Sequence, residues 1–178
     1  AVIHSVQLVP GTEITTVSEV VCEADVEDVD GDSYTLSYQW TIGSPDDWVV
    51  IGAGDRIVLD PALVSPTEQL SCVVSLDGEN ESQTSWQSSF IQNSSPIIES
   101  AEIVSTSALR VGATATCIVD ATDRDQEQLS TNIQWRLNSN QVLGVGEIFE
   151  LPVQLNAQRG DELSCLVTVT DPHGAQAD

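Results

Sequence analysis

The chain has 178 residues, 40% of them hydrophobic, which is enough for one large or two small globular domains. Its 28 acidic residues face five arginines and no lysine, for a formal net charge of −23. Such a surface repels nucleic acids and anionic membranes, so both are excluded as partners. No apolar run approaches the roughly 20 residues of a membrane-spanning helix, and no membrane insertion is expected.

Apolar and polar residues alternate along most of the chain, which predicts β-strands, and helix-period patterns are absent. Turn residues such as Pro10-Gly11 and Gly52-Ala53-Gly54 separate the alternating segments. In the first half, the expected strands are 1–9, 15–24, 34–40, 48–51, 56–59, 70–76 and 85–92. An acidic loop follows the second of these strands, and a linker at 93–96 precedes a second copy of the pattern.

A Cys–Trp–Cys pattern occurs twice, at Cys22, Trp40 and Cys72 and again at Cys117, Trp135 and Cys165. Each Trp follows its first Cys by 18 residues, and each second Cys ends the tripeptide Leu-Ser-Cys. A sandwich of two antiparallel sheets is pinned by a disulfide between its layers, with a Trp packed beside it. The sequence therefore predicts an all-β chain of two tandem immunoglobulin-like β-sandwiches, each with one inter-sheet disulfide.

The four cysteines occupy equivalent places in the two copies, which predicts the bridges Cys22–Cys72 and Cys117–Cys165. Zinc sites need cysteines in closely spaced pairs, and these are far apart. Paired cystines indicate an oxidising compartment, and we expect an extracellular or cell-surface location.

An offset of 95 residues superimposes the first Cys and the Trp of the two copies, which predicts domains at 1–95 and 96–178. The sequence stops before the counterpart of 85–92, so the second sandwich is expected to lack its last strand. A sandwich without an edge strand exposes unpaired backbone groups. Three explanations are open: the chain is cut from a longer array, which is the favoured one, its tail is disordered, or a strand from another copy fills this place. For the last, the alternating segment Val2–Val9 is a candidate donor.

The recurring features are Cys22, Asp-Val-Asp-Gly-Asp at 28–32, Tyr38-Gln39-Trp40, Leu70-Ser71-Cys72, Asp77-Gly78 and Asn93-Ser94-Ser95-Pro96. With these features the chain resembles the immunoglobulin-like, cadherin-like or PKD-like repeats of large bacterial surface and secreted proteins. The resemblance implies a stalk, an adhesin spacer or a fibre subunit. The second copy departs from the pattern at Arg124-Asp125-Gln126-Glu127, where the loop glycine is lost.

Two acidic loops are the candidate metal sites. Under the 95-residue offset, four acidic positions recur: Asp25, Asp28, Asp30 and Asp32 in the first copy and Asp120, Asp123, Asp125 and Glu127 in the second. Hard oxygen ligands at alternating spacing suit Ca²⁺, the expected cofactor, although the EF-hand spacing is not met. The alternative is a solvated turn. The first loop is favoured over the second, where Arg124 reduces the negative charge.

Trp48 and Trp86 lie outside the repeated pattern and are candidates for a sugar-stacking platform, the alternative being that each caps the edge of a sandwich. The two histidines, His4 and His173, have no catalytic motif around them, and no nucleophile motif or phosphate loop is present. An enzyme is therefore not expected.

These patterns predict a non-enzymatic extracellular structural protein, a segment or subunit of a surface fibre, filament or stalk. Its expected partners are other copies of itself or neighbouring immunoglobulin-like repeats. The alternative function is an adhesin or a carbohydrate-binding accessory module of a larger secreted protein.

Overall fold

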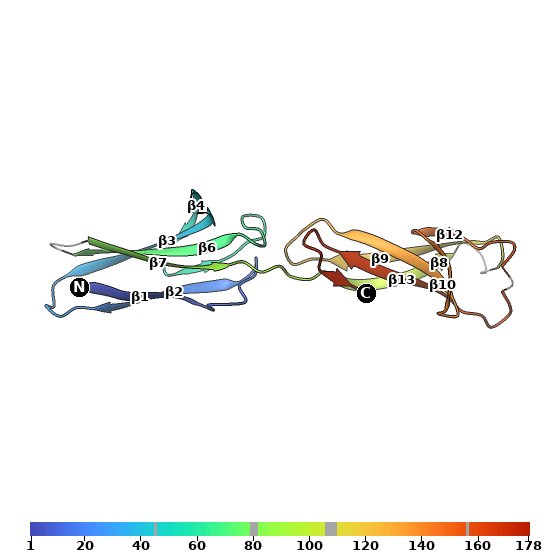
Figure 1. The fold of residues 1–178 in the computed structure, drawn as a ribbon, viewed down its shortest axis with the longest axis horizontal. Coiled ribbons are helices and arrows are strands. Elements are labelled where there is room, and N and C mark those ends of the chain that lie inside the picture. The colour runs from blue at the N-terminus through green and yellow to red at the C-terminus, as the bar shows by residue number, and fades with distance from the viewer. Residues whose placement is uncertain (45, 79–81, 106–109, 156) are drawn as a thin grey trace. The chain divides into compact units, whose positions relative to one another are not determined.

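The computed structural model describes residues 1–44, 46–78, 82–105, 110–155 and 157–178, and it is all-β (Figure 1). The chain forms two compact units, Ala1–Ser94 (unit 1) and Ser95–Asp178 (unit 2). Each unit is a sandwich of two antiparallel sheets, as the alternation of apolar residues predicted. None of the described segments is a helix long and apolar enough to cross a membrane.

Unit 1 contains a three-stranded sheet of order β1-β2-β5 and a four-stranded sheet of order β4-β3-β6-β7. Its strands are β1 (Val2–Val9), β2 (Glu19–Glu27), β3 (Tyr34–Ser44), β4 (Asp47–Ala53), β5 (Arg56–Val58), β6 (Gln69–Gly78) and β7 (Ser82–Phe90). The strand expected at 15–24 begins only at Glu19, because Thr15–Ser18 forms a turn in which the Ser18 N–H donates to the Thr15 carbonyl at 3.1 Å.

Unit 2 repeats this topology with a β12-β9-β8 sheet and a β11-β10-β13-β14 sheet. Its strands are β8 (Ile97–Ser105), β9 (Thr114–Thr122), β10 (Ser130–Leu137), β11 (Gln141–Val145), β12 (Ile148–Glu150), β13 (Leu163–Thr170) and β14 (Gln176–Ala177). At the place that β7 occupies in unit 1, the described chain has only the two residues of β14, which pair with Val169 and Thr170.

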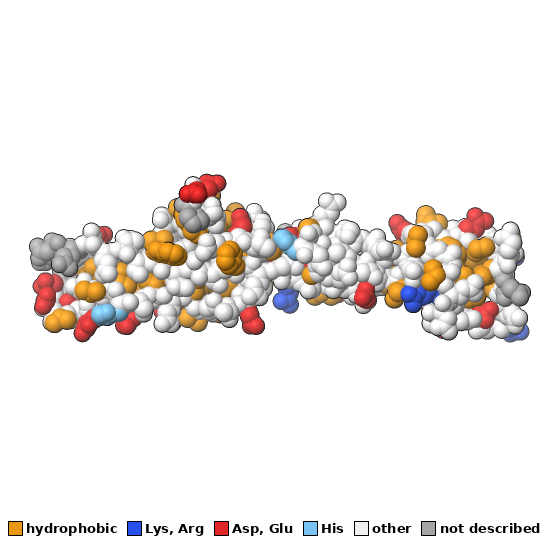
Figure 2. Space-filling model, viewed as in Figure 1, with side chains coloured by type: hydrophobic (Ala, Val, Ile, Leu, Met, Phe, Trp, Pro, Cys, Tyr) orange, Lys and Arg blue, Asp and Glu red, His pale blue; other side chains and the backbone are white. Residues whose placement is uncertain are grey.

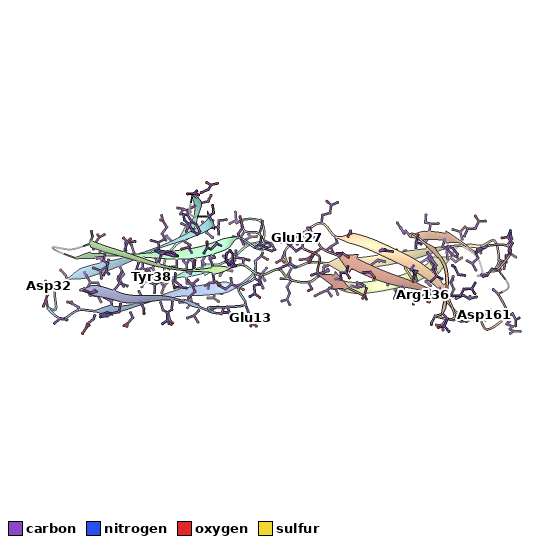
Figure 3. The ribbon with its side chains drawn as sticks, viewed as in Figure 1. Glu13, Asp32, Tyr38, Glu127, Arg136 and Asp161 are labelled. Atoms are coloured by element: carbon purple, nitrogen blue, oxygen red, sulfur yellow. A yellow bond between two sulfur atoms is a disulfide. The ribbon has the colours of Figure 1, made fainter. Side chains whose placement is uncertain are left out.

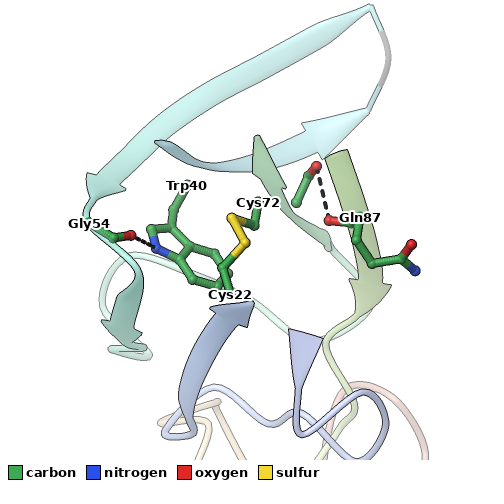
Figure 4. The surroundings of a disulfide bond; sticks show 6 residues. Cys22, Trp40, Gly54, Cys72 and Gln87 are labelled. Atoms are coloured by element: carbon green, nitrogen blue, oxygen red, sulfur yellow. Dashed lines mark hydrogen bonds between the residues drawn. A yellow bond between two sulfur atoms is a disulfide. The ribbon is translucent and has the colours of Figure 1, made fainter. Parts of the chain in front are cut away.

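One disulfide joins the two sheets of each unit, and the predicted pairs, Cys22–Cys72 and Cys117–Cys165, are confirmed. In unit 1 the indole of Trp40 lies beside the disulfide and donates its N–H to the Gly54 carbonyl at 2.8 Å (Figure 4). In unit 2 the indole N–H of Trp135 donates to the Gly146 carbonyl, also at 2.8 Å. Both Trp side chains are fully buried, so this hydrogen bond satisfies the only polar group that each carries into the core.

A glycine stands opposite each of these tryptophans, at a β-bulge in the neighbouring edge strand. In unit 2 this residue is Gly144, and a Cβ added there would lie 2.9 Å from the ring of Phe149, which stacks on Trp135 at a centroid distance of 5.5 Å. A side chain at this position would displace the ring, so the glycine lets β12 close the edge of the core.

β1 is an integral strand of its own sandwich. It pairs with β2 along Val2–Val9, and Ile3, Val6 and Leu8 are buried in the unit 1 core. The segment expected as a strand donor is therefore used within its own unit in this structure.

The chain enters and leaves unit 1 at opposite ends. The backbone N–H of Ile3 donates to Gln83 Oε1 at the start of β7, and Ser89 Oγ donates to the Gly11 carbonyl beyond the end of β1. β1 and β7 consequently run in the same direction on opposite sheets. Unit 1 therefore passes the chain from one end of the sandwich to the other.

Candidate metal centre in unit 2

Three carboxylates converge at the end of unit 2 where the chain enters it. Oxygen atoms of Asp123, Glu127 and Asp171 all lie within 4.8 Å of one another. Asp123 and Glu127 belong to the loop between β9 and β10, and Asp171 directly follows β13. Figure 3 shows Glu127 at this end of the unit and Asp161 at the other. In the part of the chain that the structure describes, no other group of three acidic, His or Cys side chains meets this distance.

The loop holds Asp123 through its own backbone. Asp123 Oδ1 accepts a hydrogen bond from the Asp125 N–H at 2.7 Å, and its carbonyl accepts one from the Gln126 N–H at 3.2 Å. Gln126 adopts a left-handed conformation (φ 58°), which turns the chain so that Glu127 comes back towards Asp123. The tight turn thus fixes two acidic side chains of one loop on the same side.

Asp171 is fixed by the turn that follows β13. Its Oδ1 accepts hydrogen bonds from the backbone N–H groups of His173 and Ala175, both at 2.9 Å. Its side chain is only 5% exposed. These bonds hold the carboxylate inside the sandwich end, next to the β9–β10 loop, because antiparallel β10 and β13 bring the end of β13 beside the start of β10.

Two oxygen atoms of this cluster have no hydrogen-bond partner within the described ranges. Asp123 Oδ2 and Glu127 Oε2 are both fully buried and unpaired. The other carboxylate oxygen of Glu127 lies 2.9 Å from Nε2 of His173, which orients the side chain. Buried carboxylate oxygens without a partner carry a substantial desolvation cost, which a bound cation would offset, so the cluster is a candidate cation site.

The electrostatics of Asp123 agree with this geometry. Burial raises the pKa of its carboxyl group, and the hydrogen bond from the Asp125 N–H lowers it. The negative charges of Asp125 and Asp171 raise the pKa further, and His173 lowers it. The folded chain by itself therefore opposes ionisation of Asp123.

The residues present fit a hard divalent cation. Ca²⁺ takes six to eight oxygen ligands at about 2.3–2.6 Å, so the oxygens around one ion lie within about 5 Å of one another. The three carboxylates satisfy this distance and provide only oxygen atoms. Asp123, Glu127 and Asp171 would hold the ion, and its charge would relieve the repulsion between them.

Two of the eight predicted ligands come together in this centre, Asp123 and Glu127. Asp120 is exposed on β9, and Asp125 is 4% exposed and lies outside the group of converging oxygens. The expectation that the first loop is the better site receives no support from the geometry of unit 1. There, Asp25, Asp30 and Asp32 are exposed, and Asp28 Oδ1 accepts hydrogen bonds from the N–H groups of Asp30 and Gly31 at 3.3 and 3.1 Å.

Asp171 and His173 were not among the predicted ligands. Both lie in the Asp-Pro-His-Gly turn after the last full strand of unit 2, far in sequence from the acidic loop. The available signal was topological: in a sandwich of this kind, the loop before the Trp strand and the turn after the second Cys strand lie at the same end. Acidic residues in these two places are therefore neighbours.

The predicted aromatic pair lies elsewhere. Trp48 on β4 and Trp86 on β7 line one groove on the outer face of the four-stranded sheet of unit 1. Trp86 is 62% exposed, so it does not cover a buried core edge.

No protein-family model matches this sequence, and no curated protein matches it.

Proposed function

We propose that this chain is a non-enzymatic structural protein of the cell exterior, a segment or subunit of a surface fibre, filament or stalk built from immunoglobulin-like repeats. One observation carries the proposal: the same disulfide-pinned sandwich occurs twice in succession along the chain. Units that pass the chain from one end to the other can be strung in series, and each adds length without new chemistry.

The inter-sheet disulfides support a role in which the chain resists a pulling force. Cys22–Cys72 and Cys117–Cys165 close loops of 50 and 48 residues. A chain extends by about 3.3–3.6 Å per residue, so each bridge prevents more than 100 Å of extension when a unit is pulled open. Disulfides persist in oxidising, non-cytoplasmic compartments. Of these compartments, we propose the cell surface.

A bound Ca²⁺ would strengthen unit 2 in this role. The ion would join the β9–β10 loop to the turn after β13 through Asp123, Glu127 and Asp171, and so link the two sheets a second time. Extracellular fluids contain millimolar Ca²⁺, and extracellular modules bind it with dissociation constants of about 10⁻⁴–10⁻³ M.

The proposed partners are neighbouring repeats or further copies of the chain. In unit 2, β13 pairs with β10 along its whole length but with β14 only at Val169 and Thr170, within the described chain. The remaining backbone groups of this edge can accept a strand from a neighbouring repeat or from another copy, and strand addition does not depend on net charge.

Immunogold labelling tests the proposal. Antibodies raised against the recombinant chain are applied to intact and to lysed cells that produce it, and the labelled structures are viewed by electron microscopy. We expect label on intact cells, along filaments or stalks. Label found only after lysis, or only on soluble material in the medium, would overturn the proposal.

A further inference from the structure

The outer face of the four-stranded sheet in unit 1 is nearly free of charge. The outward residues of its three longest strands are Thr35, Ser37, Gln39, Thr41 and Gly43 on β3, Gln69, Ser71, Val73, Ser75 and Asp77 on β6, and Ser82, Thr84, Trp86, Ser88 and Phe90 on β7. Only Asp77, at one end, is charged. On the opposite sheet, the outward residues of β2 include Glu19, Glu23, Asp25 and Glu27. In a chain with a net charge of −23, the neutrality of one face is a specific feature.

A groove of about 430 Å³ crosses this neutral face. Its lining residues come from all four strands and are Gln39, Thr41, Trp48, Ser71, Val73 and Trp86. The two indoles belong to the edge strands β4 and β7, whose backbones are separated by three strand spacings, or about 14 Å. Thr41 and Ser71 pair directly on the central strands and form the floor between them.

The β3–β4 hairpin places Trp48 at the groove. Trp48 pairs with Gly43, and a Cβ added at Gly43 would lie 2.2 Å from the carbonyl oxygen of Asp47. Only glycine fits there, and its φ of 126° lies in the region that glycine favours. Figure 2 shows hydrophobic side chains on unit 1 beneath the acidic tip of this hairpin.

The floor of the groove offers polar groups that the protein itself does not use. Thr41 is 6% exposed, yet its hydroxyl has no hydrogen-bond partner among the described residues. The side-chain amide of Gln39 likewise has none in the described ranges. Ser71 Oγ makes only a long bond, 3.4 Å, to the Gln87 carbonyl. A hydroxyl and an amide that line a groove and have no partner within the described chain are free to hydrogen-bond to a ligand.

We infer that this groove binds a neutral carbohydrate, a chain of pyranose rings, between Trp48 and Trp86. Pyranose rings present apolar C–H faces, which pack on indole rings, and equatorial hydroxyls, which bond to amides and hydroxyls such as those of Gln39 and Thr41. An uncharged groove on an acidic protein complements a neutral ligand, whereas anionic glycans are repelled by Asp46 and Asp47 at the hairpin tip and by the net charge.

A protein partner fits the face less well. Protein interfaces have an apolar core surrounded by a polar rim. Here the aromatic groups stand at the two sides, and the space between them is lined by the hydroxyl and amide groups of Thr41, Ser71 and Gln39 together with Val73. The inferred sugar site is independent of the structural role proposed above, since it uses the outer face of one sheet and leaves the core and both disulfides unchanged.

Binding of neutral hexasaccharides to the full chain tests the inference. Cellohexaose, laminarihexaose, mannohexaose and xylohexaose are titrated by isothermal calorimetry and by tryptophan fluorescence, with hexagalacturonate as the anionic comparison. Trp40 and Trp135 are fully buried, so a fluorescence change reports on Trp48 and Trp86. We expect at least one neutral sugar to bind, and hexagalacturonate to bind at least about tenfold more weakly.

Substitutions locate the site. Trp86→Ala and Trp48→Ala should each lower the affinity about tenfold or more, in the range that loss of an aromatic anchor causes. Thr41→Val keeps the shape of the side chain and removes the hydroxyl, so the fold is retained and the affinity falls about threefold or more. Phe90→Ala is the matched control, because Phe90 is an equally exposed aromatic residue on β7 (64%) that does not line the groove.

The inference is overturned if none of the neutral hexasaccharides binds, or if Phe90→Ala weakens binding as much as Trp86→Ala does. Sedimentation velocity of the same variants distinguishes the other occupant. If Trp86→Ala converts an oligomer to a monomer and no sugar binds, the face is an interface between copies of the chain, and the inference is wrong.

Discussion

At the position where unit 2 carries the carboxylate of Asp171, unit 1 has Gly78. The strand registers make the two equivalent. Thr170 pairs with Ser130 on β10 and Asp77 pairs with Thr35 on β3, and these partners occupy the same place relative to the buried Trp of each unit. Asp28 and Asp32 of unit 1 correspond to Asp123 and Glu127, and no third acidic side chain joins them among the residues of unit 1 that the structure describes. The two units therefore differ at the end of the second Cys strand, with Asp171 in unit 2 and Gly78 in unit 1.

The reverse difference holds on the outer face of the four-stranded sheet. The position of Thr41, at the floor of the unit 1 groove, is occupied in unit 2 by Arg136, whose Nε donates to Gln134 Oε1 at 2.7 Å. The β10–β11 hairpin ends at the pair Leu137–Gln141, so it has no counterpart of Trp48. The same frame therefore carries a candidate cation site in one unit and a candidate sugar site in the other.

This comparison shows which parts of the sandwich are fixed and which are free. Both units keep the disulfide, the buried Trp and the glycine carbonyl that accepts its indole N–H. All of these lie in the core, where a change in volume is costly. The differences lie in loops, hairpin lengths and outward positions, which the core does not constrain.

The largest expected effect is loss of a disulfide. In the chain-entropy model, a bridge closing a loop of about fifty residues stabilises the fold by roughly 4 kcal/mol. Among the described residues, the buried core cluster of unit 1, which includes Ile14 and Ile91, is larger than that of unit 2. Cys117→Ala with Cys165→Ala should therefore unfold unit 2, whereas Cys22→Ala with Cys72→Ala should weaken unit 1 and leave it folded. Amide hydrogen exchange, followed by mass spectrometry, measures the stability of each unit within the full chain.

Peptide mapping of the unreduced protein is the control for this experiment. Free thiols, or a bridge between a cysteine of unit 1 and one of unit 2, would contradict the pairing itself. Equal loss of protection in the two double variants would contradict the inferred difference between the cores.

The second prediction concerns the cation. Ca²⁺ at about ten times a dissociation constant of about 10⁻⁴ M should stabilise unit 2 by about 1.4 kcal/mol, and unit 1 should not respond. Asp171→Asn keeps Oδ1, and with it the hydrogen bonds from His173 and Ala175, but removes the charge that the ion needs. The variant should lose the response. The response of the unaltered chain and of the variant is measured by thermal unfolding in EDTA and in millimolar Ca²⁺. Amide hydrogen exchange, resolved by unit, shows which unit responds.

Two further variants sharpen this test. Asp120→Asn changes the charge equally on an exposed part of β9, so it should keep the full response. Gly78→Asp supplies unit 1 with the missing carboxylate and should create a weaker response there. If Ca²⁺ stabilises neither unit of the unaltered chain, the acidic loops are solvated turns.

Much of the fold could be predicted from local features of the sequence. Alternation of apolar residues located the strands, and the spacing of Cys22, Trp40 and Cys72 located the disulfide and the Trp beside it. These features repeat, so each copy checks the other. Strand ends were less certain, since β3 continues beyond Trp40, through the buried Ile42, to Ser44.

The candidate metal site could be predicted only in part, for a topological reason. Asp123 and Glu127 come from one loop, so sequence spacing suggested both. Asp171 is 44 residues further along the chain and joins them only because β10 and β13 are paired. The charge of Arg124 made the first loop the favoured site, whereas the convergence in unit 2 depends on Asp171, whose counterpart in unit 1 is Gly78.

The smallest expected effect is a pH dependence that separates the two units. Burial raises the pKa of Asp123, so the fold favours its neutral form more than the unfolded chain does. The stability that depends on the neutral group is present below the unfolded pKa of about 3.9 and is lost as the pH rises through the raised folded pKa. In EDTA, the protection of the unit 2 backbone amides from hydrogen exchange should therefore fall as the pH rises through the folded pKa of Asp123.

Asp123→Asn isolates this effect, because the amide does not titrate and the remaining acidic groups are unchanged. At low pH the unaltered protein and the variant should have similar protection in unit 2. As the pH rises in EDTA, the unaltered protein should become the less stable of the two. In millimolar Ca²⁺ the order should reverse, because the ionised carboxylate then binds the cation. A difference between the two proteins that stays constant with pH in both media would show that Asp123 neither titrates in this range nor holds an ion.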